Sequence, residues 1–444
     1  MLKRSKKSKK SKVFAFMLIL VLCITSAGMV FAAGDPIEGS ESSPAQASVT
    51  KLLKLPEGTD IPQAGFEFTV TPIEVDGLEY NSNSPNMPAI GTDGVVTISY
   101  SGSETNGTSS GGITTVSKES GNIFAGVNWP HAGFYVYEIE ENSDSYTIKD
   151  ANHETMAYSN AKYTLNVYVK EKTAAPGSFY VFAVGTIIDK KDSSSSGSVG
   201  DKVDSTPGGG ISSTNNYSGM VFTNKYVKTN GAEDPEKPNP ITESSLSVSK
   251  TVTGAFSSTS VYFDFSINVS QSAIVSGTSI YRAYVVEGSD IIGAAALADP
   301  AKNDLSTVGT DGNGNPYIEF TAGTAKSFRL KHGQKLVFIN TPVGTSYNVT
   351  EASANAYTAS ANVLTNGTSV AIPGHGEPNT ALTISNQKTG EAVNSANFIN
   401  NRDEVSPAGL NINNLPFFIV ILFAVCALAL FIFVKSRKRT DYDR

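Results

Sequence analysis

Apolar and polar residues alternate with a period of two along much of the chain between residues 47 and 403. The alternating runs are rich in aromatic and β-branched residues, and Gly, Asn, Asp and Ser separate them, which is typical of short strands joined by turns. The strands predicted in the first half are Phe66–Val70, Gly94–Tyr100, Gly133–Glu140, Tyr163–Lys170, Phe179–Ile188 and Met220–Tyr226. Those predicted in the second half are Leu246–Val252, Tyr262–Val269, Tyr281–Glu287, Tyr317–Thr321, Ser327–Leu330, Lys335–Asn340, Tyr347–Glu351 and Ala396–Asn400. Because no segment here shows convincing helical periodicity, the pattern predicts an all-β fold made of sandwiches.

The strand pattern divides into two domains, residues 47–228 and 244–403. Between them, residues 229–243 contain three prolines and few apolar residues, which predicts a stiff, Pro-rich linker. Residues 33–46 are small and polar, and they predict a flexible stem ahead of the first domain. Each domain is long enough to bury a substantial core of its own.

The amino-terminal end has the composition of an export signal. Seven of its first twelve residues are basic, an apolar run from Val13 to Phe31 follows, and small residues lie near Ala32. This order predicts a secretory signal peptide over residues 1–32, which is removed from the mature protein. The alternative is that the same segment stays as a membrane anchor.

The carboxyl-terminal end, residues 404–444, contains a second apolar run at 415–434, long enough to cross a bilayer as a helix. A basic tail follows it, so the body of the protein is expected to face outward. A short motif precedes the span, and its residues are Val405, Ser406, Pro407, Ala408 and Gly409. This order resembles a Gram-positive cell-wall sorting signal, in which a sortase cleaves before the glycine and transfers the new carboxyl to an amine. Such motifs usually carry Thr where this chain has Ala408, and the alternative is a stably anchored single-pass protein.

Composition narrows the possible functions. The only cysteines, Cys23 and Cys426, lie in the two apolar ends, so the processed protein would be an exported protein without disulfides. Without those ends the chain has 22 basic against 39 acidic residues, which argues against a nucleic-acid partner. The histidines have no metal-ligand spacing, and we find no nucleophile–base motif and no phosphate loop. We therefore expect no metal, no cofactor and no enzymatic activity on other molecules.

Three residue types recur in the same order in both domains: a lysine, a glutamate and an asparagine, each within alternating apolar sequence. The two triplets are Lys51, Glu141 and Asn224, and Lys250, Glu351 and Asn400. An aromatic strand follows each lysine, at Phe66–Val70 and at Phe263–Ile267. An internal repeat of this kind indicates tandem domains of one fold.

Each triplet contains the amine, the carboxyl and the carboxamide that an intramolecular Lys–Asn isopeptide bond requires. Burial favours both a neutral amine and a neutral carboxylic acid, so one apolar environment prepares the lysine and the glutamate together. The glutamate would then act as a self-processing catalyst that relays protons while ammonia leaves. Lys54 and Glu140 are neighbouring rivals, although alternation places them on the opposite strand faces from Lys51 and Glu141. In the second domain, Asn386 competes with Asn400.

With these motifs the chain resembles the FctA-type (streptococcal T-antigen-like) backbone pilins of Gram-positive bacteria. The resemblance rests on the segments VTK, GFYVYEIEE, VFTNKY, VSK, VGTSYNVTE and FINNRDE, together with the carboxyl-terminal signal. It implies two immunoglobulin-like (CnaB-like) sandwiches with the bonds Lys51–Asn224 and Lys250–Asn400. It also implies a lysine that sortase joins to the next subunit, seven residues before the first asparagine. That position is Tyr217 here; Lys202 is the nearest possible intersubunit lysine, and Lys190 and Lys191 are its rivals.

The sequence as a whole predicts a pilin-like structural protein of the cell surface, anchored to the cell wall or polymerised into a fimbrium. Its expected partners are a sortase, other pilin subunits or peptidoglycan, and the membrane through the carboxyl-terminal helix before processing. The alternative is a monomeric wall-anchored adhesin whose two domains form a stalk. A lysine used for linkage between subunits would distinguish the two.

Overall fold

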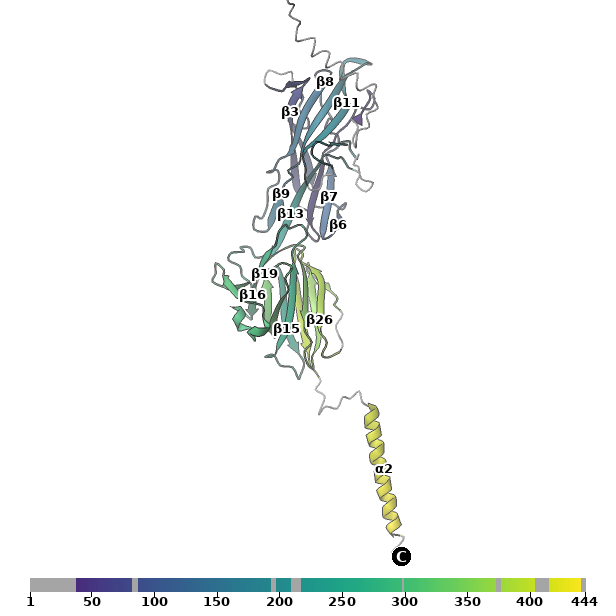
Figure 1. Ribbon diagram of the computed structural model, residues 1–444, viewed down its shortest axis with the longest axis vertical. Helices are drawn as coiled ribbons and strands as arrows, with labels where there is room; N and C mark the ends of the chain where they lie inside the picture. Colours follow the sequence, from purple (N-terminus) through teal and green to yellow (C-terminus); the bar gives the residue numbers. More distant parts are fainter. Residues whose placement is uncertain are drawn as a thin grey trace, which may run out of the picture. The chain divides into compact units, whose positions relative to one another are not determined.

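The computed structural model describes residues 37–81, 87–192, 197–208, 217–297, 299–372, 377–403 and 415–440. The described residues form two compact units, one within 37–55 and 60–226 and the other within 56–59 and 227–440. Both units are built from β-strands, and a helix follows the second one (Figure 1). The predicted fold class is thereby confirmed: two tandem all-β domains and a carboxyl-terminal apolar helix. The signal peptide predicted at 1–32 lies outside the described residues.

The first unit is a sandwich of two sheets. One sheet has the order β1 (Ile37–Glu38), β11 (Ala175–Lys190), β10 (Lys162–Lys172), β8 (Gly133–Glu141), β3 (Ala64–Val75) and β4 (Leu78–Glu79), with β12 (Lys202–Val203) paired to β11 and β5 (Val95–Tyr100) to β3. The other has the order β13 (Val221–Gly231), β2 (Thr50–Pro56), β7 (Ile113–Glu119) and β6 (Thr108–Ser110), with β9 (Glu154–Ala157) paired to β13. Side chains from both sheets form one core.

The second unit repeats this arrangement with a larger and a smaller sheet. The larger has the order β18 (Thr307–Thr310), β19 (Pro316–Thr321), β16 (Ile280–Glu287), β21 (Gln334–Phe338), β14 (Leu246–Thr253), β27 (Ser395–Asn401), β24 (Thr358–Thr365) and β25 (Thr368–Val370), with β17 (Asp290–Ile292) paired to β16. The smaller has the order β20 (Lys326–Lys331), β15 (Tyr262–Ser270), β23 (Ser346–Glu351) and β26 (Leu382–Lys388). Two single turns of 3-10 helix, Ala294–Ala296 and Pro300–Lys302, lie between β17 and β18.

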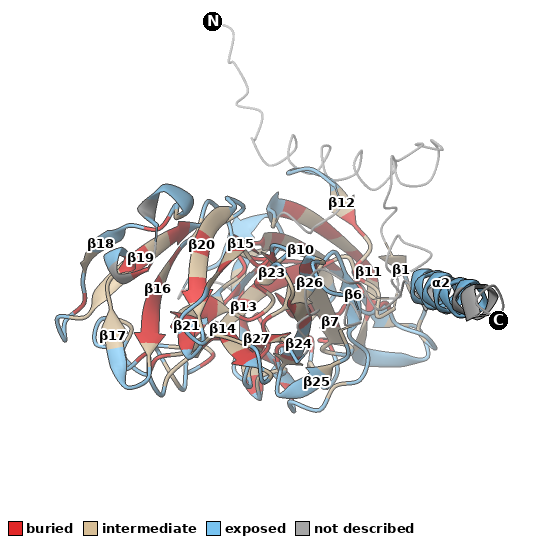
Figure 2. Cartoon of the chain, turned by 90° about the horizontal axis from the view of Figure 1, so that it is seen from below, coloured by how far each residue is buried: buried red, intermediate tan, exposed pale blue. Residues whose placement is uncertain are grey.

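In both units, apolar residues at every second position of a strand form the core. In β15 every second residue is buried, from Phe263 to Val269, while the residues between them are partly exposed. This period of two matches the pleat of a strand with one face toward the core. Figure 2 shows buried residues in red along the strands, whereas the carboxyl-terminal helix is exposed throughout its coloured part.

The Pro-rich segment after the first domain packs against the second unit over much of its length. The last residues of β13, Thr229–Gly231, pair with β22 (Asn340–Pro342). Ala232 then enters a small cluster with three residues of the larger sheet and Ile339, which follows β21. The Gly312 N–H donates to the Glu236 carbonyl at 2.7 Å. The residues of that cluster are Tyr284, Val286, Val337 and Ile339. The segment predicted to be a stiff, Pro-rich linker thus lies within the second unit, and hydrogen bonds hold parts of its backbone there.

The carboxyl-terminal helix α2 spans Leu415–Thr440. Among the described residues it is the one helix that is long and apolar enough to cross a membrane, by length and composition, over Phe417–Lys435. The short motif at 405–409 lies outside the described residues.

Candidate functional site

Strand pairing brings the lysine and the asparagine of each triplet to the same place. Lys51 lies on β2, which pairs in parallel with β13, and Asn224 lies opposite Leu53, two residues beyond Lys51. A spacing of two keeps both side chains on one face of the sheet. Because that face is the buried one, the amine and the carboxamide meet inside the sandwich.

The second unit has the same register. Lys250 on β14 lies opposite Phe398 of the parallel strand β27, and Asn400 lies opposite Val252, again two residues beyond the lysine. Two domains with little sequence in common therefore place the two reacting side chains at the same offset.

Each glutamate is the last residue of its strand, at the same point of the opposite sheet. Glu141 ends β8 and pairs with Phe68 of β3, and Glu351 ends β23 and pairs with Phe265 of β15. The aromatic strands that follow the two lysines in sequence therefore line the two clusters. This equivalence agrees with the internal repeat seen in the sequence.

In the first unit the glutamate lies between the two nitrogens. Lys51 Nζ is 2.6 Å from Glu141 Oε1, and Asn224 Nδ2 donates to the same oxygen at 2.8 Å. Lys51 and Asn224 are both fully buried, and the Lys51 amine lies 4.6 Å from the centre of the Phe66 ring. One carboxyl oxygen thus contacts both the amine and the carboxamide nitrogen.

A backbone group completes this first cluster. The N–H of Ser159, in the loop between β9 and β10, donates to Asn224 Oδ1 at 2.8 Å and to Glu141 Oε2 at 3.1 Å. The carboxamide oxygen and the second carboxyl oxygen are therefore both satisfied. Ser159 could not be predicted from the sequence, because its contribution is a backbone N–H, which carries no signature there.

In the second unit, Lys250 Nζ is 3.0 Å from Glu351 Oε1, and Asn400 Nδ2 donates to that oxygen at 2.6 Å. The amine lies 4.4 Å from the centre of the Phe263 ring. Glu351 Oε2 and Asn400 Oδ1 are buried, and neither has a hydrogen-bond partner among the described residues. The Lys–Glu–Asn core is the same, but its polar surroundings are not.

Burial is the main influence on the charges of both clusters. It lowers the pKa of Lys51 and of Lys250 to about 8, against the opposing attraction of the neighbouring glutamate. It also raises the pKa of Glu141 and of Glu351 above the ordinary value. Both directions favour a neutral amine beside a neutral acid.

The structure distinguishes the rival residues within each triplet. Glu140 is exposed and pairs with Lys162 at 3.2 Å, so it lies on the other face of β8 from Glu141. Lys54 is half-buried on the other face of β2 from Lys51. Asn386 is exposed on β26, whereas Asn400 contacts Glu351.

The lysines considered for linkage between subunits lie on β11 and β12 or just after β11. Lys202 is half-buried on the short strand β12, and Lys190 and Lys191 are exposed at the end of β11 and just after it. Lys191 Nζ donates to the Gly197 carbonyl at 2.6 Å. Tyr217, at the position where the resemblance implies a lysine, is half-buried.

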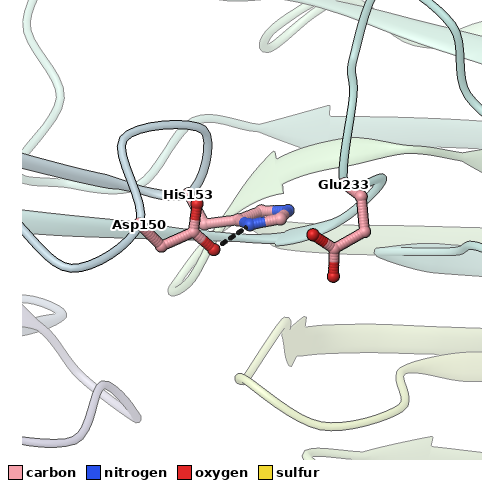
Figure 3. A group of neighbouring side chains, drawn as sticks. All are labelled: Asp150, His153 and Glu233. Carbon is pink, nitrogen blue, oxygen red and sulfur yellow. Dashed lines mark hydrogen bonds and ion pairs between the residues drawn. The ribbon is translucent and has the colours of Figure 1, made fainter.

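One histidine with an acidic neighbour invites comparison with a metal site. Asp150 and His153 of the first unit share a hydrogen bond (Figure 3). Glu233, drawn with them, belongs to the second unit. Within the described residues of either unit taken alone, no three potential ligands lie close enough together to hold a metal ion.

In each domain a buried glutamate lies within hydrogen-bonding distance of a buried lysine and a buried asparagine. Residues 47–227 match the FctA family model, described as a Spy0128-like isopeptide containing domain. The first domain is therefore identified as an FctA-type domain, and the chain is pilin-like. The resemblance found in the sequence is confirmed. Residues 244–402 match a second model, described as a domain of unknown function (DUF7601).

Comparison with solved structures returns pilus proteins, among them major pilins of Streptococcus pyogenes. The chain is 18% identical to the major pilin, with 82% of this chain and 100% of that chain covered and a TM-score of 0.30. For the major pilin T3.2 the identity is 19%, the coverage 81% and 99%, and the TM-score 0.28. The pilus-presented adhesin Spy0125 (Cpa) is 16% identical over 59% of this chain and 39% of that chain, with a TM-score of 0.21. At these TM-scores we rest no argument on the superpositions, and no curated protein matches the chain.

Proposed function

We propose that this protein is a cell-surface pilin subunit whose two domains are each closed by an isopeptide bond, Lys51–Asn224 and Lys250–Asn400. One observation carries the proposal. In both domains a single buried carboxyl oxygen contacts the lysine amine and the asparagine carboxamide nitrogen. A proton carrier between an attacking and a leaving nitrogen is the arrangement that amide exchange requires.

The reaction follows from these contacts. The neutral lysine Nζ attacks the asparagine Cγ, a new Nζ–Cγ bond forms, and the Cγ–Nδ2 bond breaks. The glutamate takes a proton from Nζ and delivers one to Nδ2, which leaves as ammonia. Because each lysine and asparagine reacts once, Glu141 and Glu351 serve maturation of the protein itself.

The position of each bond suits a protein under tension. In each domain the bond would join the lysine strand to a parallel asparagine strand, β2 to β13 and β14 to β27. Force that enters at the beginning of one strand and leaves at the end of the other shears such a pair. A covalent bond across the pair carries that force while the core stays closed.

Intact-mass spectrometry of the purified ectodomain tests the proposed bonds. We expect a mass below that of the sequence by two ammonias, with tryptic peptides that join Lys51 to Asn224 and Lys250 to Asn400. A mass equal to that of the uncorrected sequence contradicts the proposal.

For attachment, we propose that sortase cleaves after Ala408 in the motif at 405–409 and joins the new carboxyl to an amine, while α2 holds the precursor in the membrane. The support is the order of motif, apolar helix and basic tail. The amine belongs to another copy of the chain, with Lys202 as the acceptor, or to peptidoglycan.

Digestion of the cell wall separates these outcomes. Linkage through Lys202 gives a boiling-resistant ladder on a denaturing gel, and Lys202→Arg collapses the ladder to one band. A single band from the unsubstituted protein supports a monomeric wall-anchored adhesin instead. Recovery only from detergent-solubilised membrane, with residues 410–444 still attached, rules out sortase cleavage.

A further inference from the structure

Asp192, just after β11, has no part in the reaction described above, yet it contacts both sides of the first cluster. Its Oδ2 accepts hydrogen bonds from Ser159 Oγ at 2.6 Å and from the Thr223 N–H at 2.8 Å. Its Oδ1 accepts from the Asn160 N–H at 3.0 Å. Thr223 directly precedes the reacting asparagine, and Ser159 donates to that asparagine's oxygen.

We propose that the Ser159 N–H is the oxyanion donor of the first isopeptide reaction, and that Asp192 is the positioning residue that holds it against β13. This inference rests on the proposed Lys51–Asn224 bond. The single carboxylate fixes the 159–160 loop to the strand that carries the electrophile, and so sets the position of the donor relative to the carbonyl.

The chemistry of the step gives the donor its role. When Lys51 Nζ attacks Cγ of Asn224, the C=O double bond opens and Oδ1 gains negative charge. The Ser159 N–H already lies 2.8 Å from Oδ1, in a site where the asparagine is fully buried. A preorganised donor of this kind typically accelerates acyl transfer by about 10²–10³-fold. After Nδ2 leaves as ammonia, Oδ1 is again an uncharged amide oxygen.

The negative charge of Asp192 should slow the first isopeptide reaction, whereas its hydrogen bonds, which hold the donor in place, should speed it. The negative carboxylate raises the pKa of Lys51, although burial and Glu141 have larger effects, and so it disfavours the neutral amine that attacks. If Asp192 influenced the reaction through charge alone, its removal would speed bond formation. If it positions the donor, its removal slows bond formation, so the sign of the effect separates the two roles.

The test measures both bonds in one molecule. Chains recovered unfolded from inclusion bodies are refolded by dilution, and the loss of each ammonia is assigned over time by intact mass and peptide mapping. In Asp192→Ala we expect the Lys51–Asn224 bond to form at least about tenfold more slowly, given the usual effect of losing an oxyanion donor. The Lys250–Asn400 bond, far along the chain, serves as the internal control and should keep its rate.

Two further variants separate positioning from general damage. Asp192→Asn keeps one oxygen that can accept from Ser159 Oγ and the Thr223 N–H, so it should restore part of the rate. Asp189→Ala is the matched control, because Asp189 lies near the end of β11 and its carboxylate accepts from the Thr164 hydroxyl at 2.6 Å, on the neighbouring strand β10. It should leave both rates unchanged.

An unchanged or faster first bond in Asp192→Ala overturns the inference. The fluorescence of the buried Trp129 reports folding of the first domain. If Asp192→Ala loses the native fluorescence, the rate measured for Asp192→Asn tests the inference instead. In Asp192→Asn, native fluorescence with slower formation of the first bond supports the positioning role. A first bond that forms as fast as in the unsubstituted chain overturns it. Failure of the unsubstituted chain to form the first bond contradicts the proposed function itself.

Discussion

The two domains hold the same three residues in the same register, but they differ at the carboxamide oxygen. In the first domain, Asn224 Oδ1 accepts a hydrogen bond from the Ser159 backbone. In the second, Asn400 Oδ1 is buried with no partner among the described residues, and so is Glu351 Oε2. The strands therefore place the same three side chains together in both domains, whereas among the described residues a loop donates to the carboxamide oxygen in the first domain alone.

This difference has a cost and a consequence. A buried acceptor without a hydrogen bond destabilises a folded domain by about 1–3 kcal/mol. Within the described part of the chain, the oxyanion of the second proposed reaction also has no prepared donor. We infer that the Lys–Glu–Asn core is common to both sites, and that the surrounding polar groups set how fast each proposed bond forms.

The largest expected effect is the loss of a single bond when its glutamate is removed. Glu141→Ala should fold yet lack the Lys51–Asn224 bond, and Glu351→Ala should lack only the second bond, because each carboxyl contacts only its own pair of nitrogens. Each variant should weigh one ammonia more than the mass calculated for its own sequence with both bonds formed. Glu140→Ala, which alters the exposed neighbour, is the matched control and should form both bonds. Crosslinked Lys51–Asn224 peptides from Glu141→Ala would refute the role of that glutamate.

Next in size is the loss of stability when a domain matures without its bond. Lys51→Met and Lys250→Met remove the amine but keep an apolar chain of similar length. The two bonds close loops of 173 and 150 residues, from the sequence positions they join. By analogy with disulfides, each bond should contribute about 5 kcal/mol to the free energy of unfolding, nearly equal in the two domains.

Urea unfolding followed separately in the two domains measures these losses. Lys54→Met, on the other face of β2, controls for the substitution itself. A loss in Lys51→Met no greater than that in Lys54→Met would mean that the first bond does not stabilise its domain.

The fold could be read from the sequence wherever strands have one buried face. Strand β15 alternates cleanly and was predicted over Tyr262–Val269, close to its bounds of Tyr262–Ser270. Strand β2 was expected as the strand that carries Lys51, but without bounds, because most of its residues are buried and Leu52, Leu53 and Leu55 break the alternation. A strand in the middle of a covered sheet loses the period-two signal.

The residues of the two Lys–Glu–Asn clusters could likewise be predicted only in part from the sequence. Lys51, Glu141 and Asn224 were found because side chains with distinctive chemistry recur in order in the two domains. Ser159 was not found, because its contribution is a backbone N–H that every residue except proline shares. Asp192 was not found either, because an aspartate in a polar loop looks like any solvated charge until Thr223 and Ser159 are placed beside it.

A smaller effect should separate the two bonds in time. Because among the described residues only the first cluster has a donor at the carboxamide oxygen, the Lys51–Asn224 bond should form about 10²-fold faster than the Lys250–Asn400 bond in the unsubstituted chain. A time course of refolding, read by intact mass, should pass through a species that has lost one ammonia. Peptide mapping should place that loss at Lys51 and Asn224. Equal rates, or a second bond that forms first, would mean that the donor has no influence.

The smallest difference should lie in the dependence of bond formation on pH. Each pair reacts when it holds one proton in all, with the lysine neutral and the glutamate protonated. The pKa of Lys51 and of Lys250 is lowered by burial to about 8, so above that pH each pair loses its last proton. Below the raised pKa of the glutamate, the pair gains a second proton and the amine becomes charged.

Refolding in buffers of increasing pH should therefore give a bell-shaped rate for each bond. The alkaline limb should lie near pH 8 in both domains, where the pKa values of Lys51 and Lys250 are similar. Asp192 raises the pKa of Lys51, so Asp192→Asn should move the alkaline limb of the first bond to lower pH and leave the second in place. Rates that keep rising well above pH 8 would show that the bound proton is not needed, and that the glutamate does not deliver it to the leaving nitrogen.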